Sequence, residues 1–173
     1  MRLLVRLLVV LVVAAGVLAA ALYGLTRQFT AHGADMAPAV RNGDQVGVFR
    51  FSGWFYTPHR KDVVVFAAPA LAAERCRESG HLVRRVIGLP GETVTERAGA
   101  VSIDGTPLRE PYVAPGRRDS RSGSWHVPPG EYFVLGDNRK TACDSRTFGA
   151  VPKKSIVGRV VLTYWPIARV SIG

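Results

Sequence analysis

The sequence predicts a mostly β domain that follows one N-terminal apolar helix. The helix is indicated by residues 7–25, where 19 consecutive positions carry no charge, close to the ~20 residues that cross a hydrocarbon layer. The domain is indicated by short β-branched runs such as Val63–Phe66, which are typical of strands. The 18 Gly and 11 Pro residues favour many turns between these strands.

The apolar run is predicted to be a single-pass anchor in the cytoplasmic membrane. Arg2 and Arg6 precede it, and basic residues on that side favour a cytoplasmic N-terminus. A cleaved signal peptide is the alternative, with Ala19–Ala21 as the cleavage site, but its apolar part is typically about 7–15 residues. We therefore expect residues 1–26 to form the anchor with a short cytoplasmic end, and residues 27–173 to form an extracytoplasmic β domain.

Within the domain, alternating or continuous apolar runs predict the strands. These runs cover residues 45–51, 60–66, 131–135 and 156–165. Residues 100–108 predict a hairpin, because Asp104-Gly105 suits a tight primed turn.

The segments between these strands are predicted from composition. Residues 52–56 form an aromatic cluster that fits either a partly buried loop or a membrane-interface patch. Residues 67–80 lack a clear period and indicate a loop or a short helix. Residues 111–130 are rich in Pro, Gly, Ser and Arg, which predicts a mobile surface excursion.

The net charge of +10 restricts the partners of the domain. A basic surface fits nucleic acid or an anionic bilayer. The arginines are scattered, without a zinc spacing, an RNA-binding signature or a recognition helix, so we expect the lipid bilayer and no nucleic acid. Cys76 and Cys143 lack the spacing of metal ligands, and neither a metal nor a cofactor is predicted. Whether these two cysteines form a disulfide stays open, because the sequence does not supply the geometry.

Three motifs follow one another along the domain. Residues 33–44 read G-A-D-M-A-P-A-V-R-N-G-D, residues 82–92 read L-V-R-R-V-I-G-L-P-G-E, and residues 136–149 read G-D-N-R-K-T-A-C-D-S-R-T-F-G. They resemble, in the same order, the type I signal peptidase motifs G-x-S-M-x-P-T-L-x-x-G-D, L-V-K-R-V-I-G-L-P-G-D and G-D-N-R-x-x-S-x-D-S-R-x-x-G. The chain is thus similar to the signal peptidase I family of serine peptidases, peptidase S26.

This resemblance implies a fold and an activity. The fold is an antiparallel β catalytic domain of the kind that signal peptidases share with self-cleaving repressor proteases. The activity is endoproteolytic removal of signal peptides from secreted preproteins. In the family a serine attacks the carbonyl carbon, and a neutral, buried lysine takes the proton of its hydroxyl.

Three positions depart from the family at the reacting centre. Asp35 stands at the position of the nucleophilic serine, Arg84 at that of the general-base lysine, and Ala142 at that of the serine that orients the lysine. An arginine, with a pKa above ~12, cannot act as a base, and attack by a carboxylate would give an anhydride that readily reverts. We expect Asp35 and Arg84 to meet in a bidentate salt bridge that fills the site. His32 is interpreted as a surface histidine.

The other motif residues are expected to be structural. Four charged residues are expected to hold the wall of the site by charge-assisted hydrogen bonds: Asp137, Arg139, Asp144 and Arg146. Three glycines are expected to meet backbone demands at turns: Gly88, Gly91 and Gly136. The remaining matches to the motifs are Met36, Pro38, Gly43, Asp44, Arg85, Pro90, Asn138 and Ser145.

Three functional hypotheses follow from these residues. The first is an inactive homologue that binds signal-peptide-like extended segments, preproteins or an active signal peptidase. The second is an active signal peptidase with an unconventional site. The third is a structural protein of the membrane surface.

Overall fold

The computed structural model describes residues 2–50, 56–165 and 171–172. The predicted aromatic cluster at residues 52–56 falls outside these residues except for Tyr56. The helices are α1 (Arg2–Leu25), α2 (Ala70–Cys76), α3 (Ser145–Phe148) and the 3-10 turn η1 (Lys153–Ser155). The strands are β1 (Thr26–Thr30), β2 (Gln45–Arg50), β3 (Val63–Ala67), β4 (His81–Gly88), β5 (Thr93–Arg97), β6 (Ala100–Ile103), β7 (Thr106–Pro107), β8 (Gly123–His126), β9 (Glu131–Leu135), β10 (Val151–Pro152), β11 (Ile156–Trp165) and β12 (Ser171–Ile172).

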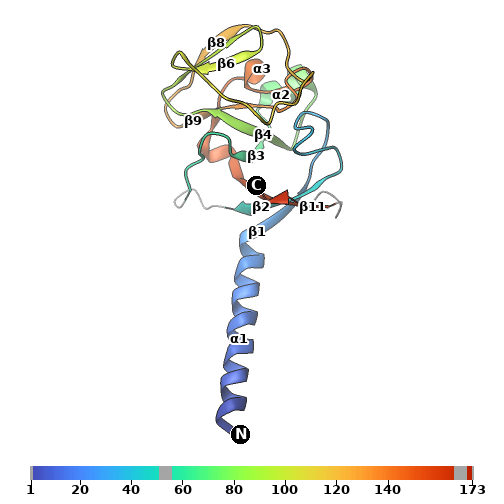
Figure 1. The fold of residues 1–173 in the computed structure, drawn as a ribbon, viewed down its shortest axis with the longest axis vertical. Helices are drawn as coiled ribbons and strands as arrows, with labels where there is room; N and C mark the ends of the chain where they lie inside the picture. The colour runs from blue at the N-terminus through green and yellow to red at the C-terminus, as the bar shows by residue number, and fades with distance from the viewer. Residues whose placement is uncertain (1, 51–55, 166–170, 173) are drawn as a thin grey trace.

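The strands form two antiparallel sheets. The larger sheet has the order β1-β2-β11-β3-β4-β9-β10, with β12 paired to β11, and the smaller has the order β7-β6-β5-β8. Because β11 pairs with both β2 and β3, the end of the described chain is inserted between strands from its first half. Figure 1 shows the smaller sheet at the end of the domain farthest from α1. The mostly β class predicted from the sequence is therefore confirmed for the domain.

Apolar side chains cover both faces of the larger sheet at β3. Val64 and Phe66 pack in one buried cluster with Phe148, whereas Val65 packs in another with Val48. Consecutive residues of a strand point to opposite faces, so the continuous apolar run of β3 fits a strand buried on both sides. A third cluster, which includes Ile87, Val94, Val101 and Phe133, joins the two sheets.

The hairpin is confirmed, but the predicted surface excursion is not mobile coil throughout. Asp104 and Gly105 connect β6 and β7 with φ values of 47° and 81°, as a primed turn requires. Within residues 111–130, β8 pairs with β5, and Val113 is buried. Composition alone missed this order because the pairing partner of β8 lies about 30 residues earlier in the chain.

Helix α1 extends away from the β domain, and β1 continues directly from its end (Figure 1). Among the described residues, no helix meets the combined requirement of length and apolarity for crossing a membrane. The anchor and its orientation therefore remain predictions.

Candidate active site

The loop that carries Asp35 is closed at its base by main-chain hydrogen bonds. The amide of Ala31 donates to the carbonyl oxygen of Asp44 (2.8 Å), and the amide of Gly43 donates to that of Ala31 (2.8 Å). Met36 and Val40 are buried against the larger sheet, which anchors the middle of the loop. Gly43 has a φ of 83°, a conformation that favours glycine. Pro38, by contrast, is exposed at the outside of the loop.

The third motif holds the backbone at Asp35 from the other side. The amide of Asn138 donates to the carbonyl oxygen of Asp35 (2.8 Å), and its side-chain Nδ2 donates to that of Ala34 (3.2 Å). A Cβ on Gly136 would lie 2.7 Å from the carbonyl oxygen of Asp35. The glycine is therefore needed for close approach of two chain segments, and the predicted turn role of Gly136 is wrong.

Arg84 lies on β4 with its side chain only 3% exposed, and it uses all three guanidinium nitrogens. Nε donates to the carbonyl oxygen of Cys143 (2.8 Å), and Nη1 donates to that of Val83 (2.7 Å). Nη2 donates to Asp35 Oδ2 (2.5 Å) and also to Glu78 Oε2 (2.7 Å). The predicted ion pair with Asp35 is confirmed, but it uses one nitrogen, so the predicted bidentate geometry is wrong.

Glu78 is the residue that sequence reasoning missed. It lies between α2 and β4, where Glu74 within α2 and Arg77 after it are also charged, and no pattern distinguishes it from them. Its side chain is 27% exposed. Burial raises the pKa of Glu78 to about 7; Arg84 opposes this rise, while the hydrogen bond to Asp35 and the charge of Asp35 add to it. The site is thus an Asp–Glu–Arg cluster rather than a pair.

A disulfide joins Cys76 to Cys143 next to this cluster, with their Cα atoms 6.1 Å apart. The question that the sequence left open is thereby answered. Cys76 ends α2 two residues before Glu78, and the carbonyl oxygen of Cys143 accepts the Nε bond of Arg84. The disulfide therefore holds two of the segments that bind the guanidinium.

Ala142 is buried beside Gly136, and its methyl group supplies no hydrogen-bonding atom. Its amide donates to the carbonyl oxygen of Asn138 (3.0 Å), which keeps the turn of the third motif closed. The reacting centre thus brings together two carboxylates, a guanidinium and a methyl group. Such a centre can hold charge and bind hydrogen-bonding groups, but it offers no hydroxyl nucleophile and no neutral amine.

Charge-assisted hydrogen bonds form the wall of the site, as predicted. Arg85 binds Asp137 through two nitrogens (2.8 and 2.6 Å), and its guanidinium carbon lies 4.3 Å from the ring centre of Tyr112. Arg146 binds both oxygens of Asp144 (2.8 Å each). Asp144 also accepts the amide of Gly136 (3.1 Å), so the wall connects to the close approach at Asp35.

Residues outside the motifs complete this wall. Arg139 forms an ion pair with Glu110, and both side chains are fully buried. Arg118 binds the same carboxylate (3.0 Å), and Arg146 also binds Asp119 (2.9 Å). Arg118 and Asp119 lie within residues 111–130 and Glu110 directly precedes that segment, so these bonds tie the segment predicted as a surface excursion to the third motif.

The remaining motif residues have structural positions. Gly91 has a φ of 85°, which confirms its turn role, and Pro90 is exposed at the same turn. The turn role predicted for Gly88 is wrong, because a Cβ there would lie 2.9 Å from the Cβ of Phe133. The amide of Arg41 donates to Asp44 Oδ2 (2.8 Å), and the hydroxyl of Ser145 accepts the amide of Val134 (2.9 Å).

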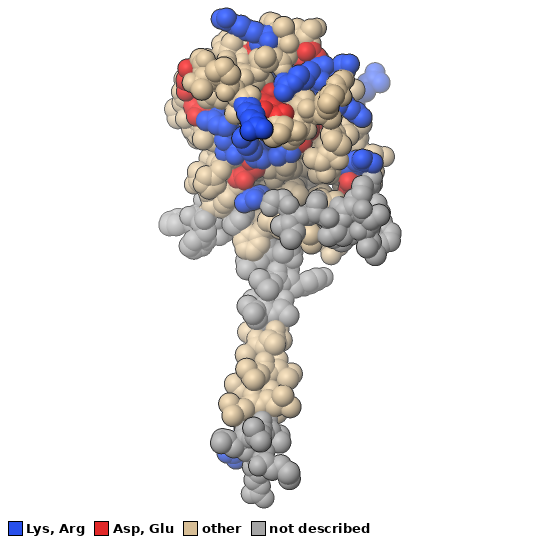
Figure 2. Space-filling model, viewed as in Figure 1, with Lys and Arg blue, Asp and Glu red and all other residues tan. Residues whose placement is uncertain are grey.

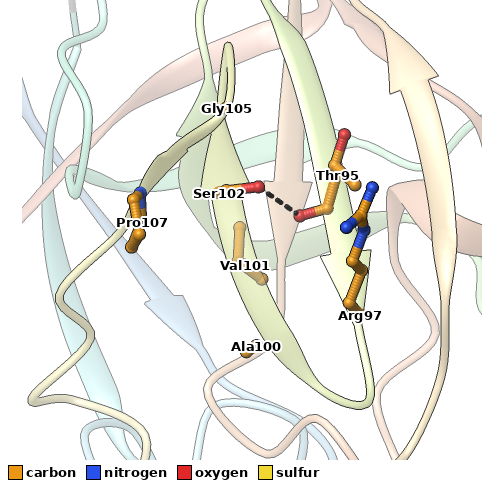
Figure 3. A pocket seen from close by; sticks show the side chains of 7 residues that line it. All are labelled: Thr95, Arg97, Ala100, Val101, Ser102, Gly105 and Pro107. Atoms are coloured by element: carbon orange, nitrogen blue, oxygen red, sulfur yellow. Dashed lines mark hydrogen bonds between the residues drawn. The ribbon is translucent and has the colours of Figure 1, made fainter.

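A pocket of about 310 Å³ lies elsewhere, on the smaller sheet. Figure 3 shows its lining residues, including Thr95, Arg97 and Ser102, whose hydroxyl donates to the carbonyl oxygen of Thr95 (3.3 Å). None of the residues that line it belongs to the Asp–Glu–Arg cluster. On the face seen in Figure 2, acidic side chains lie among the basic ones of the domain, so the positive charge there is not a continuous patch.

Comparison with known proteins agrees with the motifs. A family model described as signal peptidase, peptidase S26, matches residues 4–165. The chain is similar to a signal peptidase I of Leptolyngbya laminosa, with 39% identity over 137 residues that cover 79% of this chain and 67% of that one. It is 34% identical to signal peptidase I V of Bacillus subtilis over 143 residues, which cover 75% of this chain and 80% of that one. It is also similar to the crystal structure of a signal peptidase I from Enterococcus faecalis V583, with a TM-score of 0.51 and 33% identity over 61% of this chain and 97% of that one.

Proposed function

Because the chain belongs to the signal peptidase I family, peptidase S26, and has its antiparallel β fold, we propose that it is a membrane-anchored member that binds signal-peptide-like segments without cleaving them. The observation that carries this proposal is the engagement of Arg84. The group at the general-base position donates to two carboxylates and two carbonyl oxygens, and a guanidinium does not lose a proton in a protein. Asp35, at the nucleophile position, is held by that same cation.

Binding does not require the missing chemistry. An extended peptide is held mainly by main-chain hydrogen bonds to a sheet edge and by pockets for alternate side chains. The ordered wall of the site supports this part of the proposal, since Asp137, Asp144 and Arg146 keep their hydrogen bonds although the centre has changed. The ligand is then a preprotein, or an active signal peptidase that shares the same membrane surface.

A membrane location is part of the proposal. The uncharged run at residues 7–25 supports it, and so do the large apolar side chains described on α1, such as Leu8 and Val13, which are more than half exposed. The Cys76–Cys143 disulfide fits an oxidising compartment, which is consistent with an extracytoplasmic β domain of residues 27–173. Arg2 and Arg6 favour a cytoplasmic N-terminus.

The first experiment incubates the full chain, in a mild detergent, with a preprotein that carries an Ala-x-Ala cleavage site. We expect binding in a peptide titration and no cleavage product. Cleavage by the wild-type chain that disappears in Asp35→Ala would refute the inactive assignment. Absence of both binding and cleavage would favour the structural role at the membrane surface.

The same assay tests the second hypothesis, in which the protein is an active peptidase with an unconventional site. One observation favours this hypothesis. Asp35 and Glu78 form a hydrogen-bonded carboxyl pair, and two carboxyl groups in unlike environments are used elsewhere as the acid and the base of a hydrolysis. Both acids, however, bind the same nitrogen of Arg84, which withdraws an oxygen of each from a substrate. Cleavage that is lost in Glu78→Gln would support this second candidate.

A rescue experiment separates the reacting centre from the groove. We expect Asp35→Ser, Arg84→Lys and Ala142→Ser together with Glu78→Ala to restore weak cleavage. The change at Glu78 is needed because a carboxylate beside the new lysine would raise its pKa and keep it protonated. The matched control is the triple variant that retains Glu78, which should cleave more slowly and only at higher pH. A folded quadruple variant that binds the preprotein but stays inert would show that the groove no longer positions the scissile bond.

A further inference from the structure

Helix α2 is attached to the domain mainly by one apolar side chain and one covalent bond. It has seven residues, well below the roughly 12–15 that an isolated helix needs in water, and no side chain caps its start. Among these seven residues, all of them described, Ala72 alone is buried. The last of them, Cys76, forms the disulfide with Cys143 of the third motif. Arg75 adds one long hydrogen bond to the carbonyl oxygen of Thr147 (3.5 Å).

The main chain holds Glu78 to the end of this helix. The amide of Arg77 donates to the carbonyl oxygen of Ala73 (3.1 Å), and the amide of Glu78 donates to that of Ala72 (3.2 Å). Arg77 has a φ of 59°, the left-handed conformation with which helices commonly end. The position of Glu78 is therefore set by the end of α2, which the disulfide fixes at Cys76, two residues earlier.

Each end of the disulfide leads directly to a partner of the Arg84 guanidinium. At one end, the carbonyl oxygen of Cys143 itself accepts the bond from Nε (2.8 Å). At the other end, two residues after Cys76, Glu78 Oε2 accepts the bond from Nη2 (2.7 Å). Asp35, by contrast, lies in a loop that is closed by its own main-chain hydrogen bonds. The disulfide therefore bears on one of the two carboxylates at Arg84 and not on the other.

We propose that the Cys76–Cys143 disulfide is a redox-sensitive clamp that keeps Glu78 on Arg84. In the oxidised chain, the disulfide completes the Asp–Glu–Arg cluster. In the reduced chain, the short helix α2 loses its covalent attachment, its end frays, and Asp35 alone compensates the guanidinium. The clamp goes beyond the proposed peptide binding, because each of its steps concerns the chain alone. The redox state of the compartment thereby selects the number of carboxylates at the centre.

The reductant of the clamp is a dithiol, either a small molecule or a protein. One of its thiolates attacks the sulfur of Cys76, which is more exposed than that of Cys143. The bond between the two cysteines breaks, and Cys143 leaves as a thiolate that takes up a proton. The second thiolate of the reductant then attacks the reductant's own sulfur bound to Cys76, which is released and protonated in turn. The protein gains two electrons, and the dithiol leaves as its own disulfide.

The first test compares the oxidised full chain with the chain reduced by dithiothreitol, in detergent at pH 7.5, by urea unfolding. Reduction should raise the unfolding equilibrium constant in every variant, because the unfolded chain is no longer cross-linked. In wild type this increase should be about tenfold larger than in Glu78→Gln, because wild type also loses a charged hydrogen bond that the neutral variant lacks. Glu74→Gln, on the exposed side of α2, is the matched control and should show the wild-type increase. Equal increases in wild type and Glu78→Gln would overturn the clamp.

Hydrogen exchange of the folded chain at the same pH locates the change. The amides of Arg77 and Glu78 should lose protection on reduction, and also in Cys76→Ser with Cys143→Ser, which imitates the reduced chain without a reductant. The amide of Val86 on β4, whose main-chain hydrogen bond is 2.8 Å long, should keep its protection. Protection of Arg77 and Glu78 that survives reduction would overturn the clamp. Loss of protection at Val86 as well would also overturn it, because the disulfide would then stabilise the whole domain rather than the end of α2.

Discussion

The charge balance of Arg84 makes a prediction about stability that a double-mutant cycle can test. The guanidinium is nearly inaccessible, and its positive charge is compensated by two carboxylates on one nitrogen. Removing the last partner of a buried ion costs roughly 3–5 kcal/mol, because an uncompensated charge is left behind. Here, the first removal still leaves a partner. The two changes are therefore expected to be strongly non-additive.

The variants Asp35→Asn and Glu78→Gln preserve shape and an acceptor oxygen while removing one charge each. Burial is the largest cause of the raised pKa of Glu78, and in Asp35→Asn the smaller rise caused by the charge of Asp35 is removed, which favours the ionised form of Glu78 that compensates Arg84. We expect each single variant to lower the free energy of unfolding by about 1–2 kcal/mol, as for a hydrogen bond to a charged group. The double variant should lose about 4–6 kcal/mol, because both the two bonds and the compensation are gone.

Urea unfolding of the full chain in detergent at pH 7.5, followed by tryptophan fluorescence, measures the three losses. Glu74→Gln is the control, since this exposed glutamate lies near Glu78 in the chain. A double variant whose loss equals the sum of the single losses would refute the reasoning. Equality would mean that the two carboxylates do not act on a common charge.

Four further outcomes follow from the same structure. Lowering the pH from 8 to 5 should raise the free energy of unfolding of wild type, and this rise should be about 1–2 kcal/mol larger than in Glu78→Gln. The reason is that the raised pKa of Glu78 stabilises the fold fully below about pH 4.5, and this contribution is lost as the pH rises to about 7. The shift in pKa sets a limit of about 3 kcal/mol, which solvent around the partly exposed carboxylate reduces. Glu110→Gln should lower the free energy of unfolding by roughly 3–5 kcal/mol, because the fully buried Arg139 loses its counterion, whereas Glu131→Gln at the start of β9 should have little effect. Gly136→Ala should lower the free energy of unfolding by about 1–3 kcal/mol in the same urea assay, since the new Cβ would press on the carbonyl oxygen of Asp35. An unchanged urea midpoint of unfolding would contradict this close approach. Reduction of the disulfide, or Cys76→Ser together with Cys143→Ser, should lower the free energy of unfolding by about 2–4 kcal/mol, because the bond closes a loop across a sequence separation of 67. Equal stability of the oxidised and reduced chains would exclude this contribution.

Local patterns in the sequence were sufficient for much of the fold. The β-branched run of β3 and the Asp104-Gly105 turn are specified by residues close together in the chain, and both were predicted correctly. The meeting of Asp35 with Arg84 could also be predicted, because the family places these two positions side by side.

Features that depend on distant residues could not be obtained in this way. Glu78 reaches Arg84 because the disulfide fixes the end of α2, and the disulfide itself depends on a distance between Cα atoms that no spacing encodes. The composition of residues 111–130 predicts a mobile segment, yet Asp119 within it and Glu110 at its start are held by partners in the third motif. The motifs alone predict turn roles for Gly88 and Gly136, but the atoms that exclude a side chain at these positions come from other segments.

Glu78 also changes what the replacement of the family dyad means physically. An arginine at the lysine position needs a counterion, and with Asp35 alone the two replacements would depend on each other. Since Glu78 binds the same nitrogen, Arg84 remains compensated even when position 35 carries a neutral residue. Asp35→Ser alone should therefore fold, with the serine hydroxyl beside a guanidinium that is still neutralised by Glu78. That variant should nevertheless stay inert, because what the centre then lacks is a base rather than a nucleophile.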